Sequence, residues 1–225
     1  MRRVLSRRTV FLAAASAALG LLAGCETQVP RSDFPELAYS QLPPINLSVA
    51  RIDVIQQYHP PGKKPNVEHL FPVVPALAAE RWARDRLKAV GADGVARVTV
   101  VYAGVVEVPL KRMGGIEGAF TTEQSERYDG AIEIKIEILT GDGRMAASVS
   151  SRAERRRTVP EDITLLGREK VWFEMTEAMM NDLNASLDRQ IKENFGRWLV
   201  GGAAPGGGGG STSPSEGPIK VTPLQ

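Results

Sequence analysis

A strictly alternating segment near the middle of the chain restricts its fold more than any other feature. Residues 131–139 read AIEIKIEIL, with isoleucines at every second position and charged residues between them. Successive side chains of a strand point to opposite faces of a sheet, so this pattern predicts a strand with one buried face and one wet face. Such a sheet needs a second layer over its apolar face.

A long apolar stripe near the carboxyl end supplies that second layer. Its members recur every three or four residues, which places them on one face of an α-helix. We expect this helix to begin after Pro160, to end near Leu199 and to pack on the isoleucine face. The stripe consists of Trp172, Met175, Met179, Leu183, Leu187, Ile191, Phe195 and Trp198.

Four further segments complete the expected order. Turn-forming glycines and prolines separate them, and β-branched residues or helical periodicity assign their type. They are a strand over residues 47–58, a helix over 75–90, a strand over 96–110 and a return strand over 144–157.

Side-chain alternation also predicts the facing of residues on these strands. Val98, Val100 and Tyr102 are expected to share one face, and Gly104 is expected to mark a β-bulge. Met145 is expected to point inward at the start of the return strand.

The order is therefore strand, helix, three strands and a long helix. It predicts an α+β protein of the order β-α-β-β-β-α, a two-layer sandwich with two helices on one face of the sheet. The sheet is expected to be four-stranded and mostly antiparallel. It is expected to be mixed because the first strand reaches its partner across a helix.

The first 25 residues have the pattern of an export signal. Four arginines precede an uncharged apolar run over residues 10–23, which is shorter than the ~20 residues that span a bilayer. A short apolar run after a basic segment is typical of a secretory signal peptide. The run ends in Leu22-Ala23-Gly24-Cys25, and Cys25 is the chain's only cysteine.

Leu22-Ala23-Gly24-Cys25 resembles the lipobox of bacterial envelope lipoproteins. The resemblance implies that Cys25 is lipidated, becomes the first residue of the mature protein and anchors a periplasmic domain to the membrane. Glu26 stands where an aspartate would favour inner-membrane retention, so the outer membrane is favoured. The run Ser6-Arg7-Arg8 also resembles a twin-arginine signal, and both that route and general secretion remain open.

These features divide the chain into four parts. We expect a lipoprotein signal peptide over residues 1–24, a Pro-rich linker over 25–46 and a single α+β periplasmic domain over 47–199. Residues 200–225, rich in Gly, Pro and Ser, are expected to be a disordered tail because they offer little apolar surface to bury.

The net charge and the absence of catalytic motifs argue against two classes of function. The signal accounts for the formal charge of +2, and the remainder carries 24 basic against 26 acidic side chains. So small a charge argues against nucleic acid as a partner. No familiar nucleophile, phosphate-loop or metalloprotease motif occurs, so we expect no enzyme activity and no cofactor. His59, Glu68 and His69 are the nearest approach to a metal site, and we expect ordinary polar roles for them.

The strongest candidate for binding is a run of arginines in the return strand. Guanidinium groups bind phosphates and carboxylates in a fork geometry, so the run is a candidate site for an anion or a partner. The favoured alternative is that these arginines pair with acids such as Glu133 and Glu137 on the neighbouring strand. The run comprises Arg152, Arg155, Arg156 and Arg157.

The order of elements, together with the lipobox, is similar to that of lipopolysaccharide-assembly lipoproteins and auxiliary lipoproteins of ABC-type lipid transporters. The resemblance implies a non-enzymatic binding or accessory component of an envelope transport or assembly system, with an envelope protein complex or a lipid as partner. The alternatives are a structural spacer between membrane and peptidoglycan and an enzyme with an unrecognised acidic site. That site would gather Glu107, Asp129 or Glu133 with a histidine.

Replacing Cys25 tests the predicted anchor. Cys25→Ser removes the thiol that would accept the lipid, so fractionated cells should contain an unprocessed or soluble form. The measurement is the distribution between washed membranes and supernatant, together with the size of the protein. A variant that sediments quantitatively at mature size would contradict lipidation at Cys25.

Overall fold

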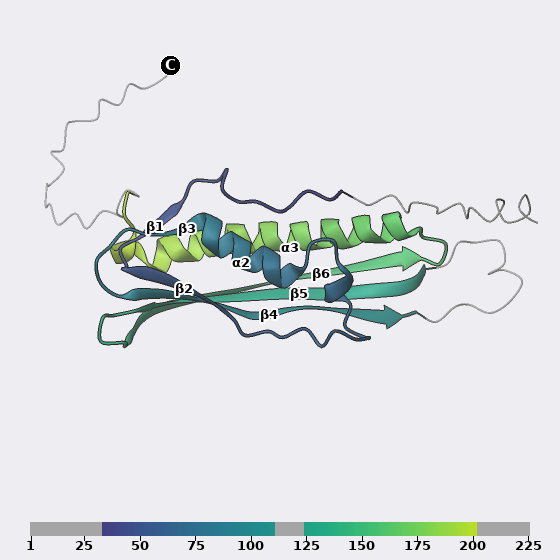
Figure 1. The fold of residues 1–225 in the computed structure, drawn as a ribbon, viewed down its shortest axis with the longest axis horizontal. Coiled ribbons are helices and arrows are strands. Elements are labelled where there is room, and N and C mark those ends of the chain that lie inside the picture. The colour runs from purple at the N-terminus through teal and green to yellow at the C-terminus, as the bar shows by residue number, and fades with distance from the viewer. Residues whose placement is uncertain (1–32, 111–123, 202–225) are drawn as a thin grey trace, which may run out of the picture. The chain divides into compact units, whose positions relative to one another are not determined.

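A four-stranded mixed sheet with two helices on one face forms the centre of the fold (Figure 1). The computed structural model describes residues 33–110 and 124–201. The predicted α+β class and element order are confirmed. The sheet comprises β2 (Arg51–Gln56), β4 (Val95–Pro109), β5 (Gln124–Leu139) and β6 (Met145–Pro160), and the helices are α2 (Pro75–Arg86) and α3 (Leu165–Asn194).

The strands lie in the order β2-β4-β5-β6. β2 pairs with β4 in parallel, and the other two pairs are antiparallel. The crossover from β2 to β4 carries α2, as a parallel connection requires. The mixed character predicted from the intervening helix is therefore confirmed.

The predicted first strand is divided in two, and the predicted first helix is shorter than expected. β1 (Ile45–Leu47) leaves the main sheet and pairs in parallel with β3 (Leu87–Ala89). α2 ends at Arg86 because the following backbone forms this small ladder. Val90, which was expected to be the last residue of this helix, is consequently 51% exposed.

The core lies between α3 and the isoleucine face of β5. The alternating isoleucines and the expected members of the stripe from Met175 to Phe195 are all no more than 1% exposed. Gly130 permits this contact, since a Cβ there would stand 2.6 Å from the terminal methyl carbon of Met175. The prediction that α3 covers β5 is confirmed.

Both ends of α3 have identifiable causes. Thr164 is the N-cap, and its hydroxyl accepts a hydrogen bond from the Gly167 N–H at 3.1 Å. After Asn194 a 3-10 turn, η4 (Gly196–Trp198), leads to Leu199, which bridges to Leu47 of β1. The last described residues therefore pair with the first strand.

Two bulges overturn the expected facing of single residues. The register of β5 with β6 shifts between Ile138 and Leu139, and Met145 is 61% exposed and does not point inward. In β4 the shift lies between Val100 and Tyr102, earlier than the expected position at Gly104. Tyr102 is therefore carried to the open face of the sheet, away from the core face that holds Val98 and Val100.

Residues 34–44 form no helix or strand, yet they pack along the two helices. We call this segment the arm. The Phe34 ring stacks on Phe173 of α3 with centroids 5.3 Å apart. Tyr39 is buried, and its N–H donates to Asp85 of α2 at 2.8 Å. The part of the predicted linker that the structure describes is thus held against the domain by named contacts.

Arg86 ties the arm to both helices. Its guanidinium is buried and donates to the Pro43 carbonyl oxygen, to Asn184 at 3.1 Å and to Asp188 at 2.7 Å. A buried guanidinium needs such a set of acceptors, because leaving it unpaired would carry a large desolvation penalty.

Within the described residues, no helix has the length and apolarity needed to cross a membrane. Cys25 and most of the predicted tail lie outside those residues.

Leu183 provides a test of the core. Leu183→Ala should lower the free energy of unfolding by about 2–5 kcal/mol, because it removes buried methyl groups and leaves a cavity. The measurement is urea denaturation of the soluble mature domain.

Asn181→Ala, at an exposed position two residues earlier, is the matched control and should change the midpoint little. Asp182 is unsuitable as a control because it forms an ion pair with Arg155. Equal midpoints for the two variants would contradict the packing of α3 on the sheet.

Candidate functional site

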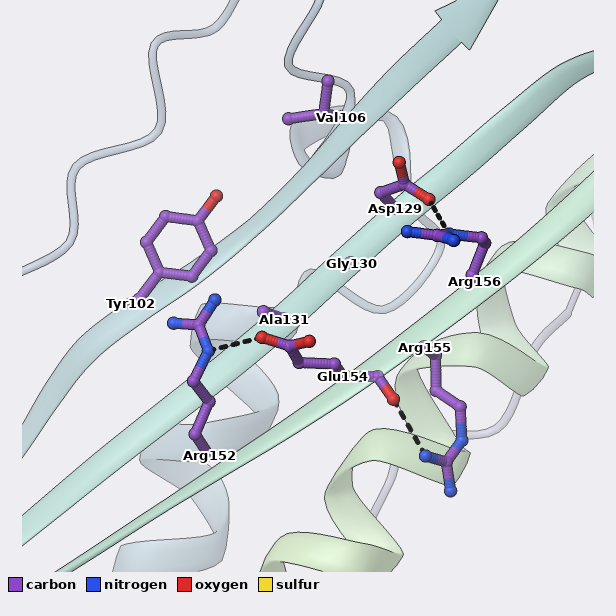
Figure 2. Close-up of a pocket in the computed structure, with 9 residues that line it drawn as sticks. All are labelled: Tyr102, Val106, Asp129, Gly130, Ala131, Arg152, Glu154, Arg155 and Arg156. Atoms are coloured by element: carbon purple, nitrogen blue, oxygen red, sulfur yellow. Dashed lines mark hydrogen bonds and ion pairs between the residues drawn. The ribbon is translucent and has the colours of Figure 1, made fainter. Parts of the chain in front are cut away.

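A hollow of about 410 Å³ lies on the open face of the sheet, opposite the helices. Figure 2 shows its polar side chains arranged around a strip of small residues on β5. It is lined by Tyr102, Val106, Asp129, Gly130, Ala131, Arg152, Glu154, Arg155 and Arg156.

Small residues form the floor of the hollow. Gly130 and Ala131 of β5 line it, and Gly104 of β4 pairs opposite Ala131. A Cβ at Gly104 would stand 2.6 Å from the Tyr102 hydroxyl oxygen and 2.7 Å from that of Tyr58. The two tyrosine rings meet edge to face with centroids 4.9 Å apart. Glycine at position 104 therefore lets both hydroxyl groups lie over the strand.

Arg152 forms one wall together with Tyr102. Its Nε donates to Glu154 at 2.7 Å and its Nη1 donates to Glu133 at 3.2 Å. The guanidinium also lies over the Tyr102 ring, 5.2 Å from the centroid. The hydrogen bond that Arg152 donates to Glu154, followed by the one that it donates to Glu133, raises the pKa of Arg152.

Asp129 forms the other wall, between two arginines. Arg127 donates to its two oxygens at 2.8–3.1 Å, and the Arg156 Nε donates to Oδ1 at 2.7 Å. These hydrogen bonds, chiefly those from Arg127, hold the pKa of Asp129 below its ordinary value of 3.8. The carboxylate is therefore ionised at neutral pH.

The four arginines predicted as one run are divided by strand alternation. Arg152 and Arg156 lie on the open face, as Figure 2 shows for both. Arg155 points toward α3, where it pairs with Asp182, and its Nη1 donates to the Glu154 carbonyl oxygen at 2.8 Å. Arg157 shares its strand face with Arg155 and donates to the Arg156 carbonyl oxygen at 3.1 Å. They do not form one cationic surface.

Most of their charge is also compensated. Of the expected acidic partners, Glu133 does pair with Arg152, whereas Glu137 pairs with Lys135 at 2.7 Å. Around the hollow, the guanidinium groups of residues 127, 152 and 156 face the carboxylates of residues 129, 133 and 154. Such a balanced surface suits a partner with both donors and acceptors better than a bare phosphate.

The sequence did not single out Tyr102, Val106 or Glu154 for binding. Tyr102 was expected on the same strand face as Val98 and Val100, because the bulge before it cannot be located from the alternation of β4. Glu154 lies within the arginine run in sequence, but it was not predicted to take part in binding. The available signal was the alternation of β6, which puts Arg152, Glu154 and Arg156 on one face.

The proposed acidic site is not assembled. Glu107 faces the helix side of the sheet and pairs with Lys64 at 2.5 Å, whereas Asp129 and Glu133 lie on the open face. His59 Nδ1 lies 2.8 Å from the Gln57 carbonyl oxygen. In the described ranges, no three His, Cys, Asp or Glu side chains are placed to hold a metal ion.

Glu68 belongs to the short 3-10 turn η2 (Glu68–Leu70) and is completely buried. It accepts hydrogen bonds from the Tyr58 hydroxyl at 2.8 Å and from the Val105 N–H at 3.0 Å. Burial, together with the hydrogen bond to Glu68, raises the pKa of the Tyr58 hydroxyl. The residue considered for metal binding thus holds a tyrosine beside the hollow.

No protein-family model matches this sequence, and no curated protein matches it. The solved structures to which the chain shows weak likeness include the following two. One is the rare lipoprotein B from Shewanella oneidensis, with 16% identity and a TM-score of 0.32 over 64% of this chain and 98% of that chain. The other is a DUF330 protein from Xanthomonas campestris, with 14% identity and a TM-score of 0.28 over 66% and 91%. Likeness at this level carries no argument about the site.

The ion pairs of Asp129 predict a pH effect. A carboxylate whose folded-state pKa is lowered stabilises the fold above its unfolded pKa, and this stabilisation is lost as pH falls through the folded value. Asp129→Asn should therefore destabilise the domain near pH 7 and reduce the further loss of stability below about pH 4.

Thermal unfolding at pH 7 and pH 3 measures this effect, with Asp162→Asn as a control at another exposed aspartate. A carboxyl NMR titration of Asp129 with a midpoint at or above 3.8 would contradict the geometry described.

Proposed function

We propose that this chain is a lipid-anchored, non-enzymatic protein of the bacterial cell envelope that binds a protein component of a transport or assembly system. The observation that carries this proposal is Leu22-Ala23-Gly24-Cys25 at the end of a short apolar run after four arginines. The anchor holds the domain in the periplasm, at the outer membrane, and the open face of the sheet meets the partner.

The composition of the open face supports a protein partner. Tyrosine and arginine are enriched at the centres of protein interfaces, where flat side chains bury area at little entropic cost. Tyr102 and Arg152 are already held against one another at the hollow, so little ordering remains to be done on binding. The balanced charges around them give a partner both donors and acceptors to match.

The same geometry disfavours catalysis at the hollow. A general acid needs a pKa near the working pH, whereas the pKa of Asp129 is lowered by two guanidinium groups. Glu133 and Glu154 are both bound to Arg152. These carboxylates position arginines and are poorly suited to transfer protons.

Photo-crosslinking in intact cells tests this function. A photoreactive amino acid replacing Val106, at the edge of the hollow, should form an adduct with an envelope protein. The same replacement at exposed Arg189, on the outside of α3, should not form that adduct.

A charge exchange sharpens the test. Asp129→Arg combined with Arg156→Asp keeps an ion pair between β5 and β6 but reverses its direction and removes the pair of Asp129 with Arg127. The variant should therefore melt at a lower temperature but remain folded in the assay, and it should form no adduct. An adduct that forms equally from Arg189, or that survives the exchange, would contradict partner binding at this face.

A further inference from the structure

Two adjacent leucines are exposed in the first turn of α3. Leu165 is 59% exposed and Leu166 is 55% exposed. We call them the leucine pair. Single exposed apolar residues are common on proteins, but neighbouring ones on a helix end form a local surface whose burial would be favourable.

The arm enters the domain at this same end of α3. Leu166 precedes Phe173 by seven residues, so the two lie on one side of the helix and roughly 10 Å apart along its axis. Phe34 stacks on Phe173. The arm then runs toward the far end of α3, where Arg86 links the Pro43 carbonyl to Asp188 (Figure 1). Phe34, the first residue of the arm, therefore lies on α3 near the leucine pair.

The covalent chain limits how far this end can lie from an anchor at Cys25. Nine peptide units connect Cys25 to Phe34, and a fully extended chain covers at most ~3.6 Å per residue, or roughly 30 Å in all. In the absence of load, the contacts of the arm hold Phe34 on α3, so that only the chain between Cys25 and Phe34 forms the tether. This step rests on the proposed function, because it takes Cys25 as the lipidated residue.

We propose that the leucine pair inserts into the surface of the membrane that carries the anchor. Half-exposed leucines at a helix end reach the boundary between headgroups and acyl chains, where apolar side chains are buried. Lys170, one turn after Leu166 and 70% exposed, lies on the same side of the helix, and its ammonium group pairs with Glu174 at 3.8 Å. Its methylene stem adds apolar area beside the leucine pair. The short tether and the direction of the arm select the bilayer as the occupant of this surface.

The charged residues near the leucine pair determine whether binding requires anionic lipid. Glu161 and Asp162 precede the leucine pair, and Arg168, Glu169 and Lys170 follow it. Because these charges sum to no net positive charge, binding should depend on apolar burial and little on anionic lipid. Vesicles of phosphatidylcholine alone are therefore a sufficient probe.

A reversible anchor makes the contribution of the leucine pair measurable. The chain from Cys25 to Gln225 is coupled at Cys25 to one saturated 14-carbon chain through a maleimide, since a single such chain binds membranes only marginally. Partition onto phosphatidylcholine vesicles is measured by sedimentation. Leu165→Asp with Leu166→Asp should weaken partition roughly tenfold, because the variant cannot bury the two side chains.

The control places the same charges at the other end of α3. Val90 and Val200 are 51% and 47% exposed, and their N–H groups donate to Leu47 and Asn46 of β1. Val90→Asp with Val200→Asp should leave partition within about twofold of the parent. The melting temperatures of both variants are compared with the parent's, and Leu165→Ser with Leu166→Ser replaces the aspartate variant if that variant does not fold.

Equal partition of the parent and the leucine variants would overturn the proposal, as would an equal loss in the control. So would a parent that binds no better than the acylated peptide of residues 25–33. Because the acyl chain is attached chemically, these outcomes do not depend on lipidation in the cell. A failure of that part of the proposed function would appear separately, as an unmodified Cys25 in the mass spectrum of protein extracted from cells.

Discussion

The close approach of α3 to β5 is the contact on which the rest of the structure depends. Gly130 allows the terminal methyl of Met175 to reach the strand, and the isoleucines beyond it fill the layer between helix and sheet. Because α3 covers that face, the side chains at the alternate positions of β5 point to the open face of the sheet. The charged network around Asp129 thus follows from the same alternation that builds the core.

The general architecture was predictable because it depends on periodicity over many residues. Errors in the position of one residue do not remove a pattern of period 2 or 3.6, so the sheet, both helices and the burial of α3 were all predicted. Single-residue events were not predictable in this way. The bulge after Val100 and the break between β1 and β2 depend on which backbone groups find partners across the sheet. Those partners are distant in sequence, and composition does not specify them.

The candidate site shows the same division. The arginine run was visible in sequence, and its ion pair with Glu133 was anticipated from strand pairing. Its separation onto two faces was also implied by alternation, yet the hollow required Tyr102 to be on the open face, which only the bulge provides. The buried Arg86 illustrates a further limit. Its acceptors are the Pro43 carbonyl oxygen of the arm and two side chains of α3, Asn184 and Asp188, which are about a hundred residues away in sequence. No local sequence pattern therefore indicates them.

The arm also determines how the domain would respond to mechanical load. A force applied to the chain before Phe34 would act on the contacts of the arm in sequence, first the ring stack on Phe173, then the Tyr39 bond to Asp85 and then the Pro43 bond to Arg86. Contacts that open one after another resist force weakly, whereas β1 is held on both sides, by β3 and by the segment at Leu199. Under tension the arm would therefore detach from the helices and lengthen first. β1 would then bear the force, and the main sheet would stay folded.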